Sequence, residues 1–187
     1  MSLFERLFGK TPKTSMSAKA PAQTTEAERR RSQDAPKTPP TSPIDLGQVK
    51  AQMVVFAQSG KTMEFLAESN KARGSEIAQI AAEVLASEPA FAETLASELA
   101  TFYTYLRDQL GRGNDIAGEA AAKRMMDPKE FMDMGRAAHL LMRAMRGEPT
   151  LCQRTAIVES LSRVEHSSDS FVSGNAQEAL RIARKSA

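Results

Sequence analysis

Hydrophobic residues recur every three or four positions along most of residues 44–187, which is the period of amphipathic α-helices. The pattern is clearest in two segments, 89–110 and 128–146. Their apolar stripes consist of Phe91, Leu95, Leu99, Phe102 and Leu106, and of Phe131, Met134, Ala138, Leu141 and Met145. No segment alternates apolar and polar residues for long enough to form a strand. The sequence therefore predicts an all-α fold, a compact bundle of about six to seven helices.

The boundaries of these helices are marked by local signals. Pro89, Pro128 and Pro149 each follow an acidic residue, and proline in the first helical turn behind a carboxylate is typical of a helix start. Glycines near 74, 111–113 and 147 are typical of helix ends. Together with the periodicity, these signals predict helices over 45–72, 76–87, 89–110, 115–126, 128–146 and 150–166, and a short one near 175–185.

The first of these helices has a heptad pattern, with apolar or small residues spaced alternately by three and four. This helix-pairing seam consists of Leu46, Val49, Met53, Phe56, Gly60, Met63 and Ala67. Glycine at a seam position lets another helix approach closely. Two interpretations are open: the seam packs inside its own bundle, or it pairs with the same helix of a second copy in a homo-oligomer.

Residues 10–43 differ sharply from the rest of the chain. Their only large apolar side chain is Met16, and they hold six of the nine prolines. Such a segment cannot bury enough surface to offset its ordering entropy. We expect a disordered Pro/Thr/Lys-rich linker over 10–43, followed by the helical domain over 44–187.

The first nine residues predict a short amphipathic helix. Its large apolar residues, at positions i, i+1, i+4 and i+5, are Leu3, Phe4, Leu7 and Phe8. So short a helix needs an apolar surface to fold upon. That surface is a membrane interface, a groove on a partner protein, or the protein's own domain. Lys10 and the lysines after it add attraction to an anionic leaflet.

Net charge and composition limit the classes of function that the sequence allows. The chain of 187 residues has a net charge of +2, but residues 1–43 hold eight basic and four acidic residues, which leaves −2 for the domain. A basic tail alone supports nucleic-acid binding as an alternative function, and the acidic domain argues against it. A single cysteine excludes an internal disulfide, and no apolar run reaches the roughly 20 residues that span a bilayer. We expect a cytoplasmic protein, with the inner face of a membrane as one site of action.

Residues with catalytic or ligand-binding chemistry are sparse. Gly60-Lys61-Thr62 resembles the end of a phosphate-binding loop, but Val55 stands where that loop needs its first glycine. His139 and His166 lack metal-binding spacing, and Cys152 has no paired cysteine. The sequence predicts no cofactor, no metal and no enzymatic activity. It favours a helical adaptor or scaffold that binds another protein through its bundle and is tethered by residues 1–9.

Overall fold

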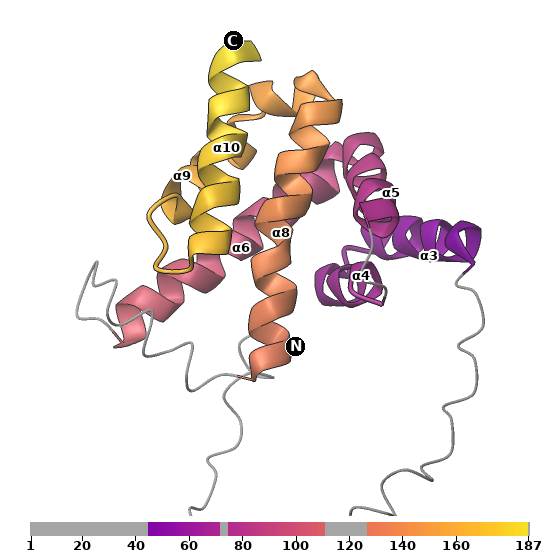
Figure 1. Ribbon diagram of the computed structural model, residues 1–187, viewed down its shortest axis with the longest axis horizontal. Coiled ribbons are helices and arrows are strands. Elements are labelled where there is room, and N and C mark those ends of the chain that lie inside the picture. The colour runs from indigo at the N-terminus through magenta and orange to yellow at the C-terminus, as the bar shows by residue number, and fades with distance from the viewer. Residues whose placement is uncertain (1–44, 72–74, 111–126, 187) are drawn as a thin grey trace, which may run out of the picture. The chain divides into compact units, whose positions relative to one another are not determined.

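The computed structural model describes residues 45–71, 75–110 and 127–186, all of which belong to one unit, Pro43–Ala187 (Figure 1). These residues form seven α-helices and a short 3-10 helix, with no strand among them, and confirm the predicted all-α fold. The elements are α3 (Leu46–Gln58), α4 (Thr62–Ser69), α5 (Ser75–Ser87), α6 (Pro89–Leu110), α8 (Pro128–Gly147), η1 (Pro149–Gln153), α9 (Thr155–Val164) and α10 (Ser170–Ser186).

Helix α8 is the centre of this arrangement. It packs against α10 on one side, against α4 and α5 on another, and against α6, which crosses behind it (Figure 1). Helix α9 fills the angle between α6 and α10, and α3 lies against α4 and α5. Because helices surround α8, most of its residues are buried.

The two predicted apolar stripes form the middle of the core. Every member of both stripes is at most 7% exposed. Phe102, Tyr103 and Phe131 join α6 to α8 as a cluster of three rings with centroids 5.3–6.1 Å apart. Each large apolar side chain buried in this way stabilises the fold by about 1.5–3 kcal/mol before entropy is counted.

Small residues bring α8 and α10 close together. Both helices bury alanines, namely Ala137, Ala138 and Ala144 on α8 and Ala176, Ala179 and Ala183 on α10. A Cβ added at Gly135 would lie 3.4 Å from both the Tyr103 hydroxyl and Val172 Cγ2. Gly135 therefore allows Val172 of α10 and the Tyr103 ring of α6 to approach α8 closely.

The proline signals mark real helix starts. Helix α6 begins at Pro89 and α8 at Pro128. Asp127 caps α8, because its Oδ1 accepts a hydrogen bond of 2.8 Å from the Lys129 backbone N–H. At the third signal, Pro149 begins the 3-10 helix η1 rather than an α-helix.

The prediction of one helix over 45–72 is wrong, because the structure has two helices there. Helix α3 ends in a Schellman turn: Gly60 N–H bonds to Ala57 O at 3.1 Å, and Lys61 N–H bonds to Phe56 O at 2.9 Å. This turn needs the left-handed backbone of Gly60, whose φ is +65°. The heptad pattern runs across a residue that ends the helix, so the seam is not one continuous stripe.

Two other boundaries differ from the prediction. The segment 150–166 is divided at Arg154, whose extended backbone (ψ 102°) separates η1 from α9. Helix α10 starts five residues before the predicted 175, at Ser170, because Asp169 Oδ1 accepts from the Phe171 and Val172 backbone N–H groups at 3.0 and 3.4 Å. The predicted helix 115–126 lies outside the described residues.

Candidate functional site

Helix α8 leaves a single line of side chains at the surface. Between Phe131 and Arg146, every residue outside this line is buried. Its members, spaced by four, three, four and three, are Met132, Arg136, His139, Arg143 and Arg146. We call this line the α8 stripe. Because residues three and four apart share one face of a helix, the stripe runs straight along α8.

One end of the α8 stripe is apolar. Met132 is 67% exposed and Phe171, at the start of α10, is 52% exposed. Both residues line an open pocket of about 360 Å³, together with Asn70, Gly135, Arg136 and Asp169. Large apolar side chains gathered at one pocket indicate an interaction surface, whereas a single exposed one needs no explanation.

Arg136 places a cation beside these apolar side chains. It is half-buried, its Nε is buried, and among the described residues that nitrogen has no hydrogen-bond partner. Burial lowers the pKa of Arg136, and the nearby Asp133 carboxylate opposes that shift. Asp133 itself is buried and accepts from Asn70 Nδ2 and, at 3.3 Å, from Lys129 Nζ. An arginine keeps its charge even when partly desolvated, so the pocket presents a cation beside its apolar side chains.

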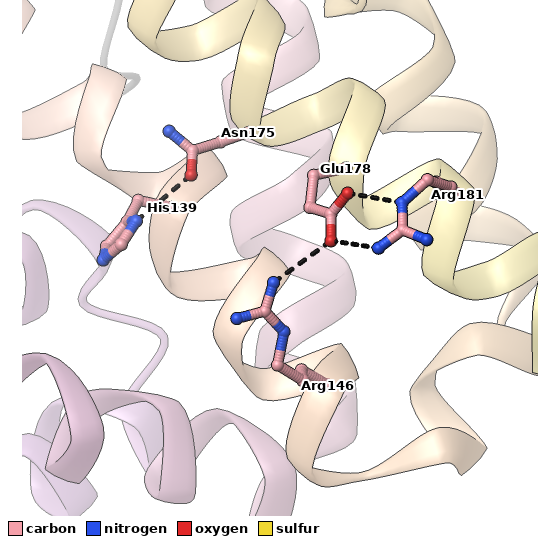
Figure 2. Close-up of polar contacts among 5 residues, drawn as sticks. All are labelled: His139, Arg146, Asn175, Glu178 and Arg181. Carbon is pink, nitrogen blue, oxygen red and sulfur yellow. Dashed lines mark hydrogen bonds and ion pairs between the residues drawn. The ribbon is translucent and has the colours of Figure 1, made fainter.

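His139 connects the stripe to α10 (Figure 2). Asn175 Nδ2 donates to Phe171 O at 2.6 Å, which leaves Asn175 Oδ1 to accept from His139 Nδ1 at 3.1 Å. The imidazole also lies 5.9 Å from the Phe171 ring, centroid to centroid, and thereby supports that exposed ring. Burial, followed by the charges of the stripe arginines, lowers the pKa of His139 below its usual 6.5, although the Asn175 bond opposes this. The ring is therefore mainly neutral at pH 7.

The other end of the stripe is basic. Arg143 donates to the neutral Gln79 Oε1 of α5 at 3.0 Å. Arg146 donates to Glu178 Oε1 at 3.1 Å, but the same carboxylate receives two bonds of 2.6 Å from Arg181 (Figure 2). The bonds from Arg181 are the main cause that lowers the pKa of Glu178 to about 2. Arg146 and Arg181 thus share one carboxylate as their hydrogen-bond acceptor. Arg146 also lines a second pocket, of about 280 Å³.

The residues predicted to dock or pair lie elsewhere. Leu3, Phe4, Leu7, Phe8 and Lys10 are outside the described residues. In the seam, Val49 and Met53 are buried in the core, and three others pack partly buried against it: Leu46, Phe56 and Met63. Gly60 lies in the exposed turn between α3 and α4.

Sequence reasoning missed the α8 stripe. The spacing of its arginines was readable, because Arg136, Arg143 and Arg146 share one helix face. The exposure of Phe171 was not readable, since an apolar residue near a helix start is usually expected to face the core.

The reactive residue types do not form a catalytic arrangement in the part of the chain that the structure describes. Cys152 is buried and donates to Met145 O at 3.6 Å, and burial raises the pKa of its thiol, which disfavours the reactive thiolate. His166 Nε2 lies 3.7 Å from the Glu165 carboxylate. No group of three or more His, Cys, Asp or Glu side chains is placed to hold a metal ion among the described residues.

Gly60, Lys61 and Thr62 join two helices. A phosphate-binding loop instead follows a strand, and the described residues contain none.

Across residues 45–71, 75–110 and 127–186, no helix is both long and apolar enough to cross a membrane.

Comparison with known proteins adds no relative: no family model, no curated protein and no solved structure matches this chain.

Proposed function

We propose that this protein is a non-enzymatic helical adaptor that binds another protein through the α8 stripe of its bundle. The observation that carries the proposal is the exposure of Met132 and Phe171 at one open pocket, 67% and 52% respectively. Burying the exposed parts of both side chains under a partner would supply about 2–4 kcal/mol before the costs of association.

The composition of this surface supports a protein as the ligand. Methionine, aromatic residues and arginine are enriched at the centres of protein interfaces, and Met132, Phe171 and Arg136 line one pocket. The Phe171 ring contacts the His139 ring, so less rotamer freedom is lost on binding.

The tether completes the proposal. Residues 1–9 dock on a membrane surface or a second partner through Leu3, Phe4, Leu7 and Phe8, and the linker 10–43 gives the domain reach. The protein acts in the cytoplasm, at the inner face of the membrane when the tether binds lipid.

The docking surface is tested by comparing the proteins that three immobilised forms retain from a cell lysate. The forms are the wild type, the double variant Met132→Ser/Phe171→Ser, and Val55→Ser, which removes a third exposed apolar side chain (58%) from α3. Exposed substitutions of this kind usually change stability by about 0.5 kcal/mol or less, and circular dichroism of each form checks that it is folded. We expect a protein that the wild type and Val55→Ser retain and the double variant loses. Identical retention by all three forms would refute the proposal.

The tether is tested separately. A fluorescent protein fused behind residues 1–43 is compared in cells with the same fusion carrying Leu7→Glu. We expect the parent to collect at a membrane and the variant to be diffuse, because a carboxylate in the apolar face opposes insertion. Diffuse signal from both fusions removes the membrane tether from the proposal.

A further inference from the structure

We infer that the partner presents an acidic amphipathic helix, which lies along the α8 stripe with its apolar side chains at Met132 and Phe171 and its carboxylates at the stripe arginines. This inference rests on the proposed function and specifies the chemistry of the partner.

The geometry of the stripe suits a helix. Its five members follow spacings of four and three, the same spacing at which a second helix presents a straight line of side chains. From Met132 to Arg146 the stripe extends for about 21 Å, or roughly four turns of a partner helix. The pockets of about 360 and 280 Å³ lie at its two ends and are both lined by α8. Partner side chains about three to four turns apart therefore have a recess at each end of the stripe.

The charges of the stripe favour carboxylates. Among the described residues, the buried Nε of Arg136 has no hydrogen-bond partner, although the Asp133 carboxylate lies near this guanidinium group. Arg143 bonds to the neutral Gln79. Arg146 shares the Glu178 carboxylate with Arg181. An incoming carboxylate thus meets guanidinium groups whose charge is incompletely neutralised, and it can form charge-assisted hydrogen bonds with them.

The nearby acids do not cancel this preference. Asp133 is buried and already bonded by Asn70 and Lys129. Asp169 lines the larger pocket, but its Oδ1 is occupied by two backbone N–H groups of α10. A nucleic acid would use the arginines but would leave Met132 and Phe171 without apolar contacts, so a protein helix accounts for more of the surface.

The test uses a phage-displayed library of random peptides of about 16 residues, which span about 24 Å as helices. The library is selected in parallel on the full-length wild type, on Arg143→Glu, and on Arg163→Glu, a control that reverses an exposed arginine on α9. Arg136→Gln is a milder second variant, in case Arg143→Glu fails to fold. We expect the wild type and the control to enrich peptides with Asp or Glu beside Leu or Phe at spacings of three and four.

The enriched peptides are then synthesised, and their affinity is measured by fluorescence anisotropy. We expect Arg143→Glu, or Arg136→Gln, to bind the acidic peptides about tenfold more weakly or worse, and Arg143→Glu to select basic peptides instead. A pool without an excess of acidic residues, or equal affinity for both stripe variants and wild type, overturns the inference. The inference is also overturned if acidic peptides do not bind and a random single-stranded oligonucleotide binds the wild type but not Arg143→Glu.

The failure of the inference and the failure of the proposed function give different results. Peptides that lack acidic residues but lose binding to Met132→Ser/Phe171→Ser leave the docking surface in place and remove only the acidic helix. Peptides that bind this double variant as well as they bind the wild type place recognition elsewhere on the protein and remove both.

Discussion

At the scale of single residues, the α8 stripe controls the ionisation of its own members. His139 lies between Arg136 and Arg143 along the stripe and is hydrogen-bonded to Asn175. When this ring is protonated, its positive charge is partly desolvated and lies near three guanidinium groups. The neutral imidazole is therefore favoured. The folded protein therefore holds this proton less tightly than the unfolded chain does.

We predict that NMR titration of the folded protein gives His139 a pKa below 6.5, and that Arg143→Gln raises this pKa by removing one of the charges. The control Arg163→Gln should leave it unchanged. Because the unfolded chain takes up the proton first, this histidine lowers the stability of the fold as the pH falls below 6.5. A pKa of 6.5 or higher in the wild type would contradict the assigned environment.

Glu178 behaves in the opposite way, because its two arginine partners favour the charged carboxylate. Its pKa falls from the ordinary value of 4.5 to about 2, so its contribution to stability is complete above pH 4.5 and is lost as the pH falls towards 2. We predict that Glu178→Gln is less stable than the wild type in urea unfolding at pH 7 and that this difference shrinks towards pH 2. A difference that does not change with pH would show that the ion pairs do not cause it.

At the scale of elements, two glycines have opposite roles in similar surroundings. Gly60 ends α3 with a φ of +65°, whereas Gly174 is an exposed residue in the second turn of α10. An added Cβ would meet no atom within 4 Å at either position. Any difference between their alanine variants therefore reports the backbone alone.

We predict that Gly60→Ala destabilises the domain by about 1–2 kcal/mol, because alanine is strained in the left-handed region. Gly174→Ala should stabilise the domain by about 0.5–1 kcal/mol, because alanine is the better helix former. Urea unfolding of the two variants beside the wild type measures both values. Shifts of the same sign would mean that the turn at Gly60 does not require glycine.

These elements also show how far local signals can be interpreted. The bounds of α6 were predicted correctly and those of α8 to within one residue, because proline and its preceding carboxylate act through the adjacent backbone. The break at Gly60 was missed because glycine fits a helix seam as well as a helix end, and hydrogen bonds formed in the folded chain decide between them.

The candidate site was less predictable, for a physical reason. Five residues of α8 were correctly expected to face the core, but the central position of α8 buries six more of its residues as well. Which narrow line stays exposed depends on α4, α5 and α10, which are distant in sequence. The placement of Phe171 beside His139 likewise brings together residues that are far apart in the sequence.

At the scale of the whole molecule, the core described here is assembled from residues 49–183. We predict that removing residues 1–43 leaves the midpoint of thermal unfolding within about 2 °C of the full-length value. A loss of 1 kcal/mol in the free energy of unfolding would shift the midpoint by more than this. Differential scanning calorimetry of both chains measures this shift. A drop of several degrees would mean that the first 43 residues contribute to the stability of the domain.

The small buried residues of α8 and α10 also limit how this chain can change over evolutionary time. Ala138 and Ala176 are fully buried, so a larger residue at either position must displace its neighbours in the core, at a cost of about 1–3 kcal/mol. Single substitutions to larger residues at these positions are therefore disfavoured. The exposed side chains of the α8 stripe carry no such packing constraint, so substitutions there can change the chemistry of this surface without disturbing the core.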